Sequence, residues 1–166
     1  WIQAHSKRLE HEFCLNGFVS IPGFVSGDEL SELLEHKRRY LRDVVPLMPT
    51  EQVYYENRDD PSTLKQLQQL WKHDEFFRAL IEGSKFRELA EILLGEVARP
   101  VNMQYFNKPP GVGKPTPPHQ DGYYFHLKPN HAVTMWLALE DVEPRQGCVN
   151  YVHCLLYTSP SPRDKH

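Results

Sequence analysis

The chain has few cysteines, no long apolar run and little net charge. Its three cysteines, Cys14, Cys148 and Cys154, show no paired spacing, which argues against a disulfide framework and a cysteine zinc site. No apolar run approaches the roughly 20 residues that a bilayer requires. A formal charge of -3 offers no broad electrostatic surface for nucleic acid. We therefore predict a reduced, cytoplasmic protein without a membrane span or nucleic-acid partner, and nothing indicates an obligate protein partner.

The 166 residues, 40% of them hydrophobic, are enough for one domain with a core, and the first half is predicted to be helical. Ser26 followed three residues later by Glu29 is typical of a capping box at a helix start. A second helix is expected to begin at Asp60-Pro61. Its apolar face would consist of Leu64, Leu67, Leu70 and Trp71. Third and fourth helices are expected over 74–83 and 84–95, each closed by a glycine.

The hydrophobic period then changes from helical to alternating. "VNMQYFNK" (101–108) has the alternation of a strand, and further strands are expected over 119–127, 132–141 and 148–152. The stretch "AVTMWLALED" (132–141) is nearly all apolar, which suits a strand buried on both faces. Helices followed by strands predict the α+β class. The expected architecture is a set of N-terminal helices flanking an incomplete double-stranded β-helix, a jelly-roll or cupin-like barrel.

The C-terminal stretch "CLLYTSPSPRDKH" does not continue the strand pattern. It resembles the translation of a transposon-end sequencing adapter, so we expect residues 1–153 to be the N-terminal part of one domain and residues 154–166 to be a non-native tail. An ordinary disordered C-terminus is the alternative. Because the chain also opens on Trp1, we expect a fragment at both ends.

The stretch "PPHQDG" places His119 and Asp121 two residues apart. On an extended backbone such residues project to the same side. An imidazole and a carboxylate form two thirds of the facial triad that holds non-haem Fe(II). Pro117-Pro118 would keep the backbone extended, and Gly122 would let it bend close to a metal-bound ligand. The alternative is a hydrogen-bonded loop histidine followed by a turn aspartate.

Four stretches together resemble the phytanoyl-CoA dioxygenase family: "NGFVSIPGFVSGDEL", "PPHQDG", "AVTMWLALED" and "QGCVNYV". The first is similar to the family's opening strand and first helix. The resemblance implies a dioxygenase that uses Fe(II), 2-oxoglutarate and O2 to hydroxylate a small-molecule or lipid-like substrate. It implies that His119 and Asp121 are iron ligands and that Lys65, Met103 and Trp136 contribute to the 2-oxoglutarate pocket. The alternatives are a solvated helix position for Lys65 and core packing for Met103 and Trp136.

After "NYV" the chain departs from the family, which continues Pro-Gly-Ser-His. His153 and the tail stand there instead, so the family's distal histidine and its 2-oxoglutarate-binding arginine are expected to be missing. His126 and His131 are the alternative candidates for a third ligand. We therefore predict that this fragment is inactive and poorly soluble, although the carboxylate of Asp121 favours hydroxylation over halogenation in the intact enzyme.

Two other classes of function remain open from the sequence. One is a noncatalytic jelly-roll binding module with a vestigial metal site. The other is a cupin-type metal isomerase or a zinc hydrolase, which would act without O2 or 2-oxoglutarate. The chemical identity of the substrate does not follow from the fold class.

Overall fold

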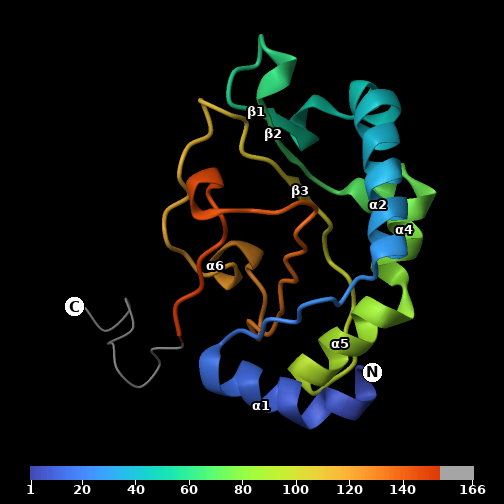
Figure 1. Ribbon diagram of the computed structural model, residues 1–166, viewed down its shortest axis with the longest axis vertical. Helices are drawn as coiled ribbons and strands as arrows, with labels where there is room; N and C mark the ends of the chain where they lie inside the picture. Colours follow the sequence, from blue (N-terminus) through green and yellow to red (C-terminus); the bar gives the residue numbers. More distant parts are fainter. Residues whose placement is uncertain (154–166) are drawn as a thin grey trace.

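The computed structural model describes residues 1–153 as helices flanking a small antiparallel sheet (Figure 1). The helices are α1 (Ser6–Asn16), α2 (Gly27–Arg39), α3 (Leu70–His73), α4 (Glu75–Glu82), α5 (Ser84–Leu94) and α6 (Gly122–Phe125). The strands are β1 (Val53–Tyr55), β2 (Leu64–Leu67) and β3 (Tyr105–Phe106), paired in the order β1-β2-β3. The α+β class is thus confirmed. The tail predicted to be foreign, residues 154–166, lies outside the described residues.

Short turns connect these elements. Turns of 3-10 type lie at Gln3–His5, Val45–Leu47, Thr50–Gln52, Pro61–Thr63 and Pro144–Gln146, and a π-helical turn follows α2 at Tyr40–Val44. Figure 1 shows α1 crossing below the other helices and α2 running beside α4, while the chain after β3 forms mostly irregular segments on the other side of the molecule. Within residues 1–153, every helix is too short or too polar to span a bilayer.

Helix α2 begins with the predicted capping box. The Ser26 hydroxyl accepts a hydrogen bond from the Glu29 backbone N–H at 3.2 Å, and the Glu29 carboxylate accepts one from the Ser26 N–H at 2.7 Å. The backbone N–H groups of Ser26 and Glu29 would otherwise be unpaired donors at the helix start. Lys85 on α5 also donates to both Glu29 carboxylate oxygens at 2.7 Å. The cap therefore joins α2 to α5 as well as starting α2.

The two helices predicted over 74–83 and 84–95 are confirmed. The Asp74 carboxylate caps α4 by accepting from the backbone N–H groups of Phe76 and Phe77, and α4 ends at Gly83. Helix α5 begins directly afterwards and ends at Gly95, whose left-handed φ of +70° stops the helix. Local signals sufficed here because the capping partners lie within a few residues of each other.

The helix predicted from Asp60-Pro61 is wrong. The Asp60 side chain does accept from the Ser62 N–H, but only a 3-10 turn follows, and the chain then enters β2. Strand pairing explains the difference, because β2 bonds to β1 on one side and β3 on the other. Leu67, expected on a helix face, is fully buried in the sheet. Gln69, with φ of 58°, separates β2 from α3.

The N-terminal strand expected from the family resemblance is also absent, since residues 17–26 contain bends and turns without strand pairing. The structure instead adds α1, which the sequence reasoning missed. The sequence signal that could have indicated it is Gly17, which ends the helix with φ of +78°. Leu9 is the fully buried residue of this helix.

The strands predicted after residue 100 are largely missing from residues 1–153. Only Tyr105–Phe106 of the stretch 101–108 pairs as β3, residues 122–125 form α6, and residues 132–138 and 148–152 make no strand ladder. Side chains of 132–141 still alternate, with Leu137 and Leu139 half-buried against the core and Trp136 exposed. The prediction of burial on both faces is therefore wrong for this segment.

The main core lies where α2 and its π-turn meet β2, α3 and α4. Its buried members are Leu33, Tyr40, Val45, Met48, Leu67, Leu70 and Phe77. Tyr40 is 1% exposed, and its hydroxyl donates towards the Met48 sulfur at 3.3 Å and the Leu70 carbonyl at 3.5 Å. Phe77 packs edge-on against its ring at 5.2 Å. Burial, and then the charge of Asp74, raise the pKa of Tyr40 to about 12, so the hydroxyl stays a donor.

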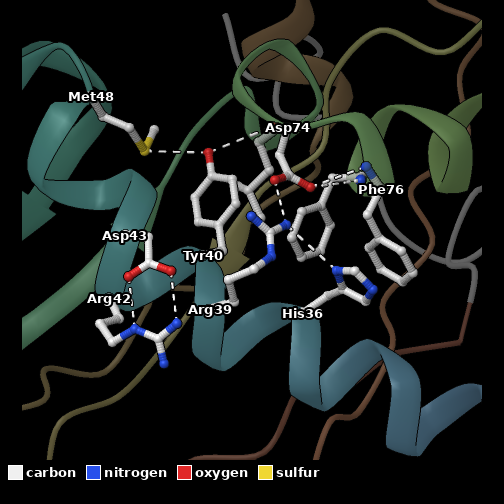
Figure 2. Close-up of polar contacts among 10 residues, drawn as sticks. His36, Arg39, Tyr40, Arg42, Asp43, Met48, Asp74 and Phe76 are labelled. Atoms are coloured by element: carbon white, nitrogen blue, oxygen red, sulfur yellow. Dashed lines mark hydrogen bonds and ion pairs between the residues drawn. The ribbon is translucent and has the colours of Figure 1, made fainter.

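Figure 2 shows how Asp74 connects α2 with α4. Its side chain is 7% exposed and pairs with the Arg39 guanidinium while capping α4. His36, one turn before Arg39, stacks on the ring of Phe76 at 3.7 Å between ring centroids. The nearby Arg42–Asp43 pair, also drawn in Figure 2, lies in solvent, with 73% and 48% of the side chains exposed. These two ion pairs differ mainly in burial.

Replacing Asp74 should therefore destabilise the fold. Asp74→Ala removes the cap, worth about 1 kcal/mol, and a charged hydrogen bond, so we expect a loss of about 2–3 kcal/mol. Asp74→Asn retains an acceptor for the cap and should lose roughly half as much. Urea unfolding followed by circular dichroism measures both. The control Asp43→Asn should leave the unfolding midpoint unchanged; equal effects at the two positions would contradict the role of Asp74.

The Glu29–Lys85 pair predicts an acid dependence. The hydrogen bond from Lys85, followed by those from Ser26, lowers the pKa of Glu29 from 4.5 to about 2. Because the folded pKa is depressed, this stabilisation is present above pH 4.5 and is lost as the pH falls towards 2. In Lys85→Met, the melting temperature should fall less steeply across this range. Lys7→Met, at an exposed position on α1, should keep the parental slope. A parental slope in Lys85→Met would disprove the coupling.

Candidate metal and cosubstrate site

His119 and Asp121 come together at the end of a Pro-rich loop. The Nε2 atom of His119 lies 3.1 Å from Oδ1 of Asp121, and 37% and 44% of the two side chains are exposed. The Nδ1 atom lies 2.8 Å from the Pro117 carbonyl, which can only accept, so Nδ1 carries a proton. Nε2 is thereby turned towards the carboxylate. The sequence prediction that these two groups converge agrees with this geometry.

The backbone that brings them together is not the expected strand. Asp121 has helical angles, φ -56° and ψ -36°, and stands at the start of α6. The pair therefore sits at a junction between a loop and a short helix. The space above Gly122, expected to admit a ligand, holds the Asn130 side chain, whose amide nitrogen would lie 2.5 Å from an added Cβ.

Aromatic side chains of α6 lie beside His119. The Tyr124 ring meets the His119 ring edge-on at 5.6 Å, and Tyr123 meets Tyr124 in the same way at 5.3 Å. Both tyrosines are exposed, at 77% for Tyr123 and 61% for Tyr124. A short helix thus presents an open aromatic surface beside the two candidate ligands.

Tyr151, in the segment 148–153, is influenced by the charge of Asp121. Burial, and then the Asp121 charge, raise the pKa of Tyr151, which places its phenol in the field of that carboxylate. Phe18, from the turn before α2, stacks on Tyr151 at 5.1 Å. His153 contacts the Asn16 side-chain oxygen at 3.2 Å. The sequence reasoning did not select Phe18 or Tyr151, since neither belongs to a ligand motif.

No cluster of three potential ligands forms in the part of the chain that the structure describes. His131, an alternative candidate for the third ligand, pairs with Glu96 at 2.8 Å. His126, the other candidate, is exposed in a left-handed conformation at the end of α6. Neither histidine joins His119 and Asp121.

The three predicted cosubstrate residues lie on separate segments. Lys65 is on β2 and pairs with Glu56 at 3.3 Å, so the helix of the alternative is wrong, although 43% of the Lys65 side chain is exposed to solvent. Met103 lies before β3, half-buried against the core, and its carbonyl accepts from Leu70. Trp136 is 45% exposed. The alternative of core packing therefore describes Met103 better than Trp136. None of the three residues forms a hydrogen bond or ion pair with His119 or Asp121.

A groove of about 530 Å³ lies near the sheet but away from this site. It is mainly apolar and is lined by Leu41, Val45, Pro46, Tyr55, Pro61, Leu64, Tyr105 and Asn107. None of the predicted ligand or cosubstrate residues lines it. The groove is therefore not part of the candidate site, which is defined by the His119–Asp121 pair and the residues around it.

Comparisons with known proteins extend over most of the chain. A family model described as phytanoyl-CoA dioxygenase (PhyH) matches residues 13–153, a range that contains all five predicted site residues. The chain is 28% identical to the peroxisomal phytanoyl-CoA dioxygenase of Mus musculus and 30% identical to that of Bos taurus. Each alignment covers 81% of this chain and 42% of the relative.

A shorter alignment, 46% of this chain and 27% of the relative, is 37% identical to a phytanoyl-CoA dioxygenase of Arabidopsis thaliana. The chain therefore spans less than half the length of these curated relatives. No solved structure matches it significantly.

Proposed function

The chain belongs to the phytanoyl-CoA dioxygenase family, and we propose that the full-length protein is a non-haem Fe(II)- and 2-oxoglutarate-dependent dioxygenase. It would use O2 to hydroxylate a small-molecule or lipid-like substrate. The observation that carries the proposal is the convergence of His119 Nε2 and Asp121 Oδ1 at 3.1 Å within the matched range.

The donor atoms of this pair suit Fe(II). An imidazole nitrogen and a carboxylate oxygen are donors of the kind that hold non-haem Fe(II), and here they lie 3.1 Å apart. The hydrogen bond from Nδ1 to Pro117 selects Nε2 as the metal-binding nitrogen. Both side chains are open to solvent, which leaves room for further ligands. We propose that the third ligand comes from a segment outside residues 1–153.

Each residue of the site then has a distinct task. His119 and Asp121 would hold the metal, and Tyr124 would limit rotation of the imidazole through its edge-on contact. The Lys65 ammonium would neutralise a carboxylate of 2-oxoglutarate, since two of its three N–H donors remain after pairing with Glu56. Met103 and Trp136 would supply apolar surface that excludes water. When bound, Fe(II) and 2-oxoglutarate supply the oxidising chemistry.

We also propose that segments 132–141 and 148–152 are strands of a jelly-roll barrel in the full-length protein. The alternating burial of 132–141 supports this, because a half-buried strand has this pattern. Unpaired strands expose backbone donors and acceptors. A chain restricted to these residues, with two metal ligands, should bind iron weakly and lack turnover.

Removing the carboxylate should release the metal. In full-length protein kept anaerobic, Asp121→Ala should lower the affinity for Fe(II) by on the order of 100-fold, since even outer partners of metal ligands contribute 10–100-fold. Equilibrium dialysis measures the affinity, and 2-oxoglutarate-dependent succinate formation measures turnover. The matched control is Asp141→Ala, at an exposed position.

Unchanged iron binding in Asp121→Ala would contradict the ligand assignment. Iron binding by the parent protein without succinate formation would favour a noncatalytic binding module.

A further inference from the structure

Lys108 begins at a fixed point on the sheet. The preceding residue, Asn107, donates its backbone N–H to the Lys65 carbonyl and its side-chain amide to the Leu64 carbonyl, both at 2.8 Å. The chain thus stays attached to β2 just beyond the end of β3. Lys108 therefore leaves the sheet from a position that β2 determines.

A tight turn follows and closes on the base of the same side chain. The Gly113 N–H donates at 2.9 Å to the carbonyl of Pro109, which is a buried residue. A Cβ added at Gly113 would lie 3.3 Å from the Lys108 Cβ and 3.1 Å from the Pro109 carbonyl oxygen. The turn therefore passes close to the lysine at a residue that has no side chain of its own.

The far end of the Lys108 side chain lies across Gly147, which is distant in the sequence. A Cβ added at Gly147 would lie 2.7 Å from both Cδ and Nζ of Lys108 and 3.2 Å from its Cε. Because these distances are too short for a real Cβ, any larger residue at 147 would displace the lysine. Gly147 also has a left-handed φ of +78°. Two separate requirements therefore favour glycine at this position.

The turn that carries Gly147 is held by its own hydrogen bonds. The Glu143 N–H donates to the Gln146 side-chain oxygen at 2.6 Å, and the Gln146 N–H donates back to the Glu143 carbonyl at 2.9 Å. The Gly147 N–H donates to the Pro144 carbonyl at 3.0 Å. Lys108 therefore connects two turns that are each closed by local bonds.

The shape of the two turns, and not an ion pair, accounts for this contact. Within residues 1–153, Lys108 forms no ion pair, and the Glu143 carboxylate is already paired with Arg145 at 2.7 Å. Lys108 remains exposed, as a lysine does when its methylene groups lie along a surface and its ammonium stays in water. The position of the stem consequently depends on the room that Gly113 and Gly147 leave for it.

The two ends of the contact lie on the two segments that the proposed metal site requires. The loop 108–118 runs into His119, and residues 148–153 lead from Gly147 towards the part of the protein in which the third ligand is expected. We propose that Lys108 is a positioning residue, whose side chain fixes these two segments relative to each other across Gly147. The role in iron binding rests on the proposed function, whereas the contact between the two turns does not depend on it.

The test follows hydrogen exchange of the Gly113 and Gln146 backbone amides in the full-length protein. Lys108→Ala removes the stem, so both amides should exchange about tenfold faster while those of α2 stay unchanged. Lys108→Met keeps an unbranched stem and should retain parental exchange. Gly147→Asn tolerates the left-handed φ but adds a Cβ, so it should displace the lysine and match Lys108→Ala at Gln146. The control Gly111→Asn, with φ of +77° and nothing within 4 Å of the added Cβ, should leave Gln146 unchanged.

A double variant tests the contact itself. Lys108→Ala and Gly147→Asn remove the same contact, so together they should make the Gln146 amide exchange no faster than Lys108→Ala does alone. Effects that multiply in the double variant would overturn the inference. So would a parental Gln146 amide in Lys108→Ala, whatever reaction the protein catalyses.

Iron affinity, measured by anaerobic equilibrium dialysis, tests the positioning role. Lys108→Ala should bind Fe(II) about tenfold more weakly, and Lys108→Met should bind it as the parent does. Removal of a positive charge would by itself favour a cation, so weaker binding in the alanine variant reports lost positioning. Faster exchange with parental iron affinity in Lys108→Ala would overturn that role. If Asp121→Ala also leaves iron binding unchanged, the proposed function has failed, and the exchange rates alone decide whether Lys108 joins the two turns.

Discussion

The carboxylate of Asp74 is the point on which the packing of the helices depends. A carboxylate that is 7% exposed must be satisfied on all sides, and here the Arg39 guanidinium and two backbone N–H groups do so. These contacts set α4 against α2 and bring Phe77 onto Tyr40 and Phe76 onto His36. The Tyr40 hydroxyl in turn donates to the Leu70 carbonyl, which connects the same cluster to the start of α3.

The candidate site lies in the least regular part of the described chain. Most of the chain from β3 to residue 153 is irregular, so the position of His119 is governed by side-chain contacts more than by strand pairing. His119 contacts the Pro117 carbonyl and the Tyr124 ring, and the Phe18–Tyr151 stack joins the segment 148–153 to the turn before α2. Of these contacts, the Phe18–Tyr151 stack joins parts of the chain that are distant in the sequence. A loop that carries ligands needs this support, because functional geometry tolerates little displacement.

The sequence predicted some of this well and some of it poorly, for physical reasons. Helix ends were predicted well, because the capping box of Ser26 and Glu29 and the glycines that end α4 and α5 act over only a few residues. Leu64 and Leu67 have helical spacing and still form a strand, because the strand partner of Leu67 in β3 is Tyr105, which lies far along the sequence. The segment 132–141 has a strand pattern but forms no ladder within residues 1–153, since a ladder also requires a neighbour. No sequence motif distinguishes Glu56 from the other polar residues around it, so its pairing with Lys65 was not predicted.

The sequence by itself determined the family, the capped helices and the pairing of His119 with Asp121, because each depends on motifs or on contacts between near neighbours. Only the tertiary structure decided that Lys65 belongs to a strand, that Glu56 holds it, and that Asp121 begins a short helix. These features arise where segments distant in the sequence meet. Burial and electrostatic pairing between such segments follow from the packed fold, so local patterns alone do not specify them.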